Sequence, residues 1–188
     1  MRQKFETFFK KHPQLKEAKL LLAISGGVDS MVLWELLVGH SLNVDLAHVN
    51  FQLRGEESEK DQAFLEKEAK KRKTKLHLLR ADTKNYAATK KLSTQIAARQ
   101  IRYNWFEELM QVHSYDYLLT AHHLDDSIET FFINLDRGTG LKGLSGIQSK
   151  EKVLRPLLEF TKNEIISFAE VQNIPFREDT SNADSNYV

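Results

Sequence analysis

The sequence contains no cysteine among its 188 residues. This absence excludes a disulfide framework, a zinc or iron–sulfur site with thiolate ligands, and a thiol nucleophile or persulfide carrier. The sequence also has no apolar run long enough to span a membrane, and its first residues, MRQKFETFFKKHPQ, lack the apolar core of a signal peptide. We therefore expect a cytoplasmic protein without a membrane partner.

The chain has no large excess of charge of either sign. It holds 27 Lys and Arg against 26 Asp and Glu, a formal net charge of +1, so a nucleic-acid partner must be sought in local patterns. Hydrophobic residues make up 41% and charged residues 28%, which is typical of a globular domain and not of disorder. The length suits one domain with a sizeable core.

Short apolar runs alternate with helix-length segments. The runs cover residues 20–24, 44–49, 75–79 and 117–121, and runs of this kind are typical of strands covered on both faces. Helices are predicted over 31–38, 58–73, 93–112 and 124–135, and the capping box of Thr161 and Glu164 predicts another. This alternation predicts an α/β fold: a doubly wound, mostly parallel sheet with helices on both faces, Rossmann-like in arrangement.

Three of the predicted helices carry more specific expectations. Ser58 and Asp61 are spaced like a capping pair, which places a helix start at Ser58. Apolar residues at helical spacing predict faces that pack into the core. These residues are Ala97, Ile101, Trp105, Leu109 and Val112 in one helix, and Leu124, Ile128, Phe131, Phe132 and Leu135 in another.

The stretch LLLAISGGVDSM, residues 20–31, interrupts a buried strand with two glycines. At the carboxyl end of a parallel strand, glycines let successive N–H groups face one anion, and the next helix adds the positive end of its dipole. Ser25 and Ser30 can add hydroxyl hydrogen bonds. Asp29 would repel a bare phosphate, which suggests a phosphate bridged by Mg²⁺. A helix start with two packing glycines is the plain alternative.

The spacing within this stretch is neither that of the Gly-Lys-Ser/Thr P-loop, nor that of a dinucleotide fingerprint, nor that of a hydrolase nucleophile elbow. The six residues SGGVDS resemble instead the loop of the N-type ATP pyrophosphatases, the PP-loop superfamily. The resemblance implies an adenine nucleotide alpha hydrolase-like fold and cleavage of ATP between its α and β phosphates. It makes Ser25, Gly26, Gly27, Val28, Asp29 and Ser30 the ATP-binding residues.

Three later stretches narrow the resemblance. They are HVNFQLR (48–54), ARQIRY (98–103) and TAHHLDDSIET (120–130). Together with SGGVDS and the segments 138–140, 143–147, 155–158 and 178–182, they resemble the tRNA(Ile)-lysidine synthetases over nearly the whole chain from about Leu20. Phe51 departs from the family pattern, which usually has a second histidine there, so any role of that ring is absent or performed otherwise.

The resemblance implies a ligase that uses ATP and Mg²⁺. ATP adenylates the C2 oxygen of the wobble cytidine in tRNA(Ile) with a CAU anticodon, and the ε-amine of free L-lysine then attacks C2 and expels AMP. It also implies that residues 1–188 are the ATP-binding PP-loop catalytic domain without the C-terminal tRNA-binding domains of the family. We therefore expect ATP binding to survive in this chain and tRNA affinity to be weak.

Titratable residues gather where the fourth predicted strand leads into a helix. Asp125, Asp126 and Glu129 share the first turns of that helix, and His122 and His123 precede it. These five are candidate catalytic or lysine-binding residues, and one of them could take the proton from the attacking amine. Asp126 and Asp29 are the candidate Mg²⁺ ligands. Acids that merely complement the helix dipole are the alternative.

Basic and polar residues suggest a place for phosphates or tRNA. Arg99 and Arg102 are three residues apart on one helix and could fork onto phosphates or onto the lysine carboxylate, although two solvated arginines are the alternative. His48 and Asn50 could line the adenine or ribose end of ATP or could be structural. Arg54, in the same block, joins the candidates for phosphate or tRNA.

Other functions remain open at this point. An NAD synthetase-like amidating ligase would turn over without RNA, and a non-catalytic adenine-nucleotide-binding module would bind without turnover. Sulfur-transferring members of the superfamily need cysteines, which this chain lacks. The oligomeric state also remains open, and a homodimer is compatible with the sequence.

Overall fold

The computed structural model describes residues 1–136, 138 and 152–178. Residues 139–140, the segment 143–147 and residues 179–182, which contributed to the family resemblance, lie outside these ranges. The elements are α1 (Arg2–Lys11), a 3-10 helix (Pro13–Lys16), β1 (Leu20–Ala23), α2 (Val28–Gly39), β2 (Val44–Asn50), α3 (Glu56–Lys71), β3 (Leu76–Arg80), α4 (Thr83–Lys90), α5 (Thr94–Val112), β4 (Tyr117–Leu119), α6 (Leu124–Asp136), β5 (Val153–Leu154) and α7 (Lys162–Val171).

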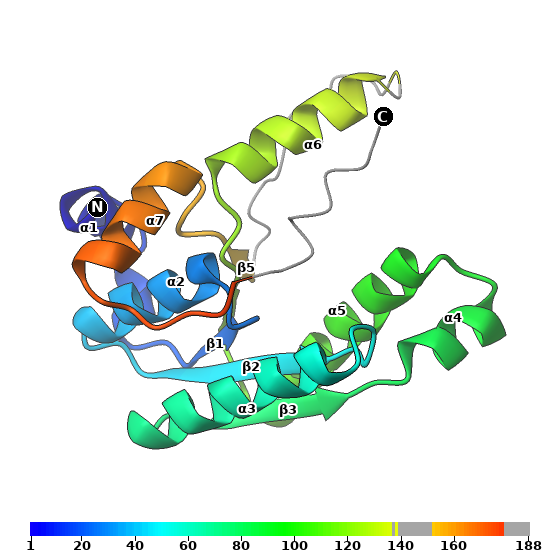
Figure 1. Ribbon diagram of the computed structural model, residues 1–188. Coiled ribbons are helices and arrows are strands. Elements are labelled where there is room, and N and C mark those ends of the chain that lie inside the picture. Colours follow the sequence, from blue (N-terminus) through cyan, green and yellow to red (C-terminus); the bar gives the residue numbers. More distant parts are fainter. Residues whose placement is uncertain (137, 139–151, 179–188) are drawn as a thin grey trace.

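The five strands form one sheet in the order β3-β2-β1-β4-β5, and every neighbouring pair is parallel (Figure 1). The chain first builds outward from β1 to β2 and β3, and then crosses to the other side of β1 for β4. In register, Leu22 of β1 lies between Leu46 of β2 and Leu119 of β4. The sheet order therefore reverses between β1 and β4, and this is where parallel α/β sheets bind their ligands.

Both faces of the sheet are covered, as predicted, and β1 shows how. Leu20 and Leu22 face one core, which also contains buried side chains of α1, α2, α3 and α7. Leu21 faces a second core, which contains Phe106 and Leu109 of α5. Because side chains alternate along a strand, a strand buried on both faces must be apolar at every position. The run LLLA meets that requirement, and the doubly wound fold is confirmed.

One predicted helix start needs correction, and two elements were not predicted. Helix α3 begins at Glu56 and not at Ser58, because Gly55 turns the chain with a φ of +52°. Ser58 then lies within the first turn, where its Oγ accepts the N–H of Arg54 at 3.2 Å. Helix α4 and the two-residue strand β5 were not predicted, since neither carries a clear apolar period.

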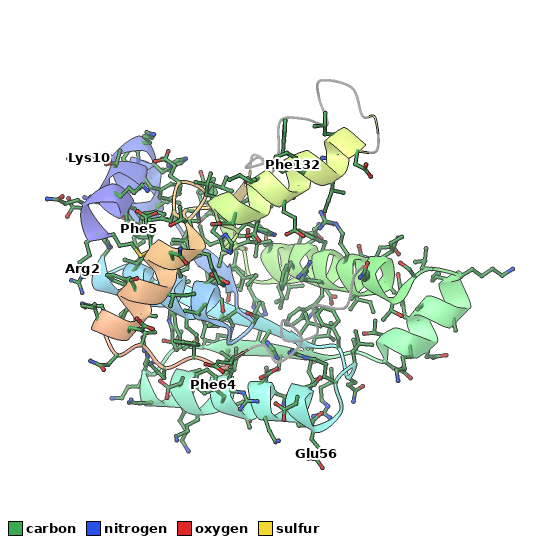
Figure 2. The ribbon with its side chains drawn as sticks, turned by 45° about the horizontal axis from the view of Figure 1, so that its top comes forward. Arg2, Phe5, Lys10, Glu56, Phe64 and Phe132 are labelled. Atoms are coloured by element: carbon green, nitrogen blue, oxygen red, sulfur yellow. The ribbon has the colours of Figure 1, made fainter. Side chains whose placement is uncertain are left out.

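The apolar residues predicted to bury α6 do not do so. Within the part of the chain that the structure describes, no side chain of α6 is buried, and Phe132 is 60% exposed (Figure 2). Helical spacing identifies an apolar face, but it does not specify which element will cover that face. The matching prediction for α5 is right for Ala97 and Leu109 and wrong for Val112, which lies at the exposed end of the helix.

The N-terminal helix α1 packs on the same side of the sheet as α2 and α7. Its Phe5, labelled in Figure 2, is fully buried. The ring of Phe9 lies edge-on to that of Phe5, with centroids 5.0 Å apart. In the described residues, no helix combines the length and the apolar character that crossing a bilayer requires.

Candidate active site

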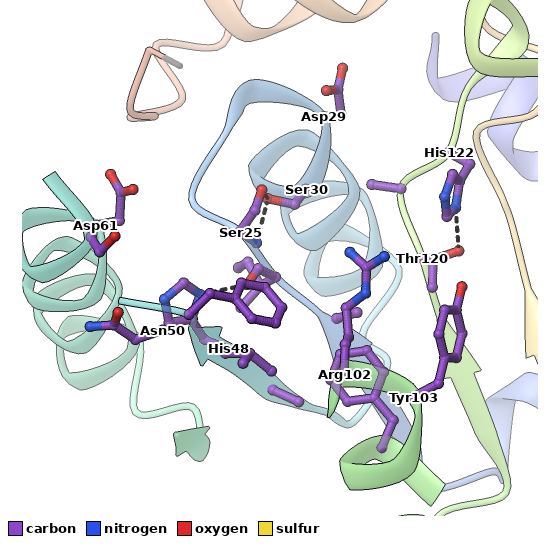
Figure 3. A pocket seen from close by; sticks show the side chains of 18 of the residues that line it. Ser25, Asp29, Ser30, His48, Asn50, Asp61, Arg102, Tyr103, Thr120 and His122 are labelled. Atoms are coloured by element: carbon purple, nitrogen blue, oxygen red, sulfur yellow. Dashed lines mark hydrogen bonds between the residues drawn. The ribbon is translucent and has the colours of Figure 1, made fainter. Parts of the chain in front are cut away.

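A cavity of about 320 Å³ lies at the carboxyl ends of β1, β2 and β4 (Figure 3). Its lining comes from the loop after β1, the segment from β2 into α3, one face of α5, and the segment between β4 and α6. The predicted site residues that line it are Ser25, Asp29, Ser30, His48, Asn50, Arg54, Arg102, His122 and Asp126. Gly26, Gly27, Val28, Arg99, His123, Asp125 and Glu129 are not among its lining residues. The cavity is of a size typical of small-molecule sites.

The loop between β1 and α2 is organised by its two serines. Ser30 Oγ accepts the N–H groups of Ser25 at 3.2 Å and Gly26 at 3.3 Å, and it donates to the Gly27 carbonyl at 3.0 Å. The Gly27 N–H donates to Ser25 Oγ at 3.2 Å. The N–H groups of three successive residues thus converge on hydroxyl oxygens at the start of α2, which is the geometry of an anion cradle. Val28 contributes packing instead, because its side chain is buried in the first core.

Asp29 projects from the first turn of α2 and is held by α7. Lys162 Nζ donates to both of its carboxylate oxygens at 2.7 Å. His123 is buried close by, with Nε2 3.8 Å from Asp29 Oδ1 and 3.7 Å from Asp126 Oδ2. Lys162 was not among the sequence candidates. The capping box located the start of its helix, but the packing of α7 beside α2 decides where its side chain reaches.

The three carboxylates of α6 take different positions. Asp126 lines the cavity, and its Oδ2 accepts the N–H of His123 at 2.8 Å. Asp125 Oδ2 accepts the N–H of Lys162 at 2.7 Å, so this side chain caps the first turn of α7. Glu129 is exposed one turn further along α6. The structure therefore brings Asp126, and not the whole predicted cluster, to the cavity.

His122 is a neutral group in a basic part of the cavity. Its Nδ1 lies 2.9 Å from Thr120 Oγ1, as the dashed line in Figure 3 shows. Burial lowers the pKa of His122 to about 4, and the positive charges of Arg155 and Arg102 act in the same direction. A group with so low a pKa is a poor proton acceptor at pH 7, so His122 is suited to hydrogen bonding.

His48 and Asn50, at the end of β2, make hydrogen bonds that stabilise the fold. His48 Nδ1 lies 2.9 Å from the Ile24 carbonyl, and burial lowers the pKa of His48, which keeps the ring neutral and makes Nδ1–H the donor. The Asn50 amide donates to Glu59 at 3.1 Å and Gln62 at 3.0 Å, both on α3. These contacts are those of the structural alternative that the sequence left open, although both side chains also line the cavity.

The two arginines of α5 share one aromatic ring. The guanidinium of Arg99 lies 4.9 Å from the centroid of Tyr103, and that of Arg102 lies 5.5 Å from it. Burial lowers the pKa of Arg102, and this arginine and Tyr103 line the cavity (Figure 3). Arg102 is thus placed to meet a ligand there, whereas Arg99 lies outside the lining.

Arg54 reaches the cavity as part of an ion-pair chain. Its Nη2 donates to Asp61 Oδ2 at 2.7 Å, and Arg177 Nε donates to Asp61 Oδ1 at 2.9 Å. Asp61, predicted as a helix cap, is therefore a buried acceptor shared by two arginines. Asp61 and Arg177 were not among the sequence candidates, because nothing local marks residues whose partners are more than a hundred positions away.

The donor set near Asp29 suits Mg²⁺ only in company with phosphate oxygens. No group of three His, Asp or Glu side chains in the described residues has the arrangement of a metal site. However, Mg²⁺ at nucleotide sites commonly uses one or two carboxylates together with phosphates and water. Asp29 and Asp126, which both approach His123 Nε2, fit that requirement.

The cradle of N–H groups, the carboxylate beside it and the parallel sheet define an ATP-using fold, and a family comparison agrees. The chain belongs to the PP-loop domain family, whose model matches residues 1–188.

Among curated proteins, the chain is similar to tRNA(Ile)-lysidine synthases. It is 40% identical over 180 residues to that of Bacteroides thetaiotaomicron, covering 95% of this chain and 42% of the relative. It is 39% identical over 190 residues to that of Bacillus subtilis, covering 96% and 40%. The chain thus spans about two fifths of the length of these curated relatives.

Solved structures share the fold at low identity. The U34-tRNA thiolase NcsA from Methanococcus maripaludis, described with its [4Fe-4S] cluster, matches with a TM-score of 0.74 at 19% identity, covering 94% of this chain and 65% of that one. The NH3-dependent NAD synthetase from Campylobacter jejuni matches with a TM-score of 0.62 at 16% identity, covering 97% and 79%. The fold of the chain is therefore the PP-loop, adenine nucleotide alpha hydrolase-like fold.

Proposed function

We propose that residues 1–188 are the ATP-binding catalytic domain of a ligase that joins lysine to C2 of the wobble cytidine of tRNA(Ile) with a CAU anticodon, giving lysidine. One observation carries the proposal: Asp29, Arg102, His122 and Asp126, from three separate segments of the chain, line one cavity beside the loop after β1. Each belongs to a sequence block that resembles the lysidine synthetases, and the curated relatives bear that name. As a tRNA-modifying reaction, it belongs in the cytoplasm.

The first step is adenylation of the cytidine. The C2 oxygen attacks the α-phosphorus of ATP, the bond from that phosphorus to the bridging oxygen breaks, and pyrophosphate leaves. The N–H groups of Ser25, Gly26 and Gly27 and the start of α2 suit the pyrophosphate, because they cluster around the neighbouring hydroxyl oxygens of Ser30 and Ser25 at the positive end of the helix dipole. Asp29 and Asp126 would hold Mg²⁺ with the phosphate oxygens, and the bound ion would neutralise charge on the leaving group.

The second step replaces AMP by lysine. The neutral ε-amine attacks C2, the bond from C2 to the AMP oxygen breaks, and the amine loses a proton. Among the carboxylates that line the cavity, Asp29 is held by Lys162, and Asp61 is held by two arginines, so we assign the acceptance of that proton to Asp126. Arg102 supplies positive charge for the lysine carboxylate or for a phosphate. Glu129 is exposed on α6, and Arg99 lies outside the cavity lining. We assign to them contacts with the parts of lysine and tRNA that extend beyond the cavity.

The test is pyrophosphate release from ATP by this chain, with lysine and a CAU-anticodon tRNA. The tRNA is supplied at high concentration, because we expect this domain to bind it weakly. Multiple turnovers should need both lysine and tRNA, and lysidine should appear in the digested RNA. Release that is equal when tRNA is omitted would contradict the proposal and support an amidating ligase of small molecules. ATP binding without any release would support a non-catalytic module.

A further inference from the structure

The segment that follows α7 runs directly against the loop between β1 and α2. Ile174 in this segment is buried in the first core, and three residues later the N–H of Arg177 donates to the carbonyl of Gly26 at 2.9 Å. In Figure 1 the segment, drawn in red, passes below α2 toward the start of that helix. The loop is thus held from outside by a residue far from it in sequence, in addition to its own serines.

This one hydrogen bond fixes the direction of a second backbone group. The carbonyl of Gly26 and the N–H of Gly27 belong to the same planar trans peptide, so they point in opposite directions. Because Arg177 holds the carbonyl on its side, the Gly27 N–H faces the other way, toward Ser25 Oγ at 3.2 Å. Gly26 has a φ of +93°. Because glycine has no Cβ, it can also adopt several other backbone conformations, so an external contact is needed to hold the peptide in this one.

The side chain of Arg177 anchors the segment to α3. Its Nε donates to Asp61 Oδ1 at 2.9 Å, and its Nη2 donates to Glu57 Oε2 at 2.6 Å. Hydrogen bonding to Asp61 raises the pKa of Arg177, so the guanidinium is charged at all working pH values. Asp61 also binds Arg54, which lines the cavity. The Arg177 guanidinium therefore connects the segment after α7 to α3 and, through Asp61, to Arg54 in the cavity lining.

We propose that Arg177 is a positioning residue for the phosphate end of the nucleotide site: it holds the Gly26–Gly27 peptide so that the Gly27 N–H faces the anion. This inference rests on the proposed use of the loop to bind the phosphates of ATP. Arg177 does not line the cavity and does not need to touch the nucleotide. Its removal should therefore weaken binding of phosphates and leave binding of the nucleoside unchanged.

The test compares Arg177→Ala and Arg177→Lys with Arg80→Ala. Arg80 is a matched control, because it forks onto Glu59 of the same helix at 2.8 and 2.7 Å and has no bond to the loop. Calorimetry with ATP, pyrophosphate and adenosine as separate probes gives the affinities. Arg177→Ala keeps the backbone N–H that contacts Gly26 but removes the guanidinium that anchors this segment to Asp61 and Glu57. With the segment no longer anchored, the variant should lose roughly tenfold in affinity for ATP and pyrophosphate, and less than twofold for adenosine. Arg177→Lys should recover part of the loss.

A second measurement covers the case in which Arg177→Ala folds poorly. Amide hydrogen exchange at Gly27 in the protein without nucleotide should be faster in Arg177→Lys than in Arg80→Ala. Unchanged ATP affinity with unchanged exchange would overturn the inference and leave the proposed function intact. An equal loss for adenosine and ATP would also overturn it, because it would indicate a general structural role. A wild-type chain that binds no ATP would overturn the proposed function and this inference together.

Discussion

Lys162, the first residue of α7, places its ammonium nitrogen 2.7 Å from both carboxylate oxygens of Asp29, the acid that follows the loop glycines. The sequence suggested that Asp29 needs a cation if phosphate is to bind beside it. The structure contains such a cation within the protein, so an incoming triphosphate meets a nearly neutral pair. Mg²⁺ remains compatible with Asp29, but it is no longer required to explain why an acid lies in an anion cradle.

A double-mutant cycle on Lys162→Ala and Asp29→Ala measures this pair. We expect a coupling of about 1 kcal/mol in the free energy of unfolding, because both groups are partly shielded and the contact is bidentate. Urea denaturation at pH 7 of the wild type, the two single variants and the double variant supplies the four free energies of unfolding. The pair Lys11–Glu159 is the control, since its side chains are 60% and 65% exposed and 3.5 Å apart, and its coupling should be close to zero. Equal coupling in both pairs would contradict the expectation.

Asp125 and Asp126 are neighbours in sequence with separate expected effects. Asp125→Ala removes the side-chain acceptor of the Lys162 N–H and should lower the free energy of unfolding by about 1 kcal/mol. Asp126→Asn keeps the shape of the cavity but removes the carboxylate assigned to the second step, so multiple-turnover pyrophosphate release and lysidine formation should fall roughly a hundredfold, as for loss of an acid–base group. Urea titrations and the release assay check the two effects. A hundredfold loss of release in Asp125→Ala with none in Asp126→Asn would reverse the assignment.

Gly26 and Gly39 give a matched pair of glycine substitutions. Gly26→Ala forces a side chain into a φ of +93° and should cost about 2 kcal/mol, although the new Cβ itself would meet Phe64 and Leu65 at ordinary distances of 3.6 and 3.7 Å. Gly39→Ala, at the end of α2, meets open space and should stabilise the protein by about 0.5 kcal/mol. Thermal and urea unfolding of both variants checks the opposite signs.

His122 predicts a loss of stability in mild acid. Burial lowers the pKa of His122 from 6.5 to about 4 in the folded protein, so between these values the unfolded chain binds a proton that the folded chain does not. The contribution of His122 to the free energy of unfolding is present above pH 6.5 and is lost as the pH falls toward 4. The free energy of unfolding should decrease by on the order of 2 kcal/mol between pH 7 and pH 5. His122→Gln should show a correspondingly smaller decrease in urea titrations at the two pH values. Parallel decreases in both proteins would rule out this source.

The sequence was sufficient to predict the architecture because its strongest signals are local. Runs such as LLLA at β1 must be buried on both faces, and a sheet of such strands separated by helices has few arrangements. The errors arose where a local pattern depends on a distant partner. The apolar residues of α6 show a clear period, yet Phe132 stays exposed because the period does not supply a covering element.

The same distinction explains the site. Asp126, His122 and Arg102 were found because they lie at strand exits or in recognisable blocks, and strand exits converge in a parallel sheet. Lys162, Asp61 and Arg177 were missed, because their importance comes from contacts across the fold. Asp125 was assigned to the site with Asp126, but at adjacent helix positions the two side chains point in different directions, one to the cavity and one to α7.

The ties from Lys162 to Asp29 and from Arg177 to Glu57 span 133 and 120 positions of the chain. During synthesis on the ribosome, the glycine loop emerges early, but the residues that complete its surroundings emerge only after more than a hundred further amino acids. A nascent chain that stops short of α7 would carry an Asp29 with no counter-charge and a Gly26 carbonyl with no donor. Acquisition of nucleotide affinity would therefore report that the last helix has docked, which makes ATP binding a natural marker for completed folding.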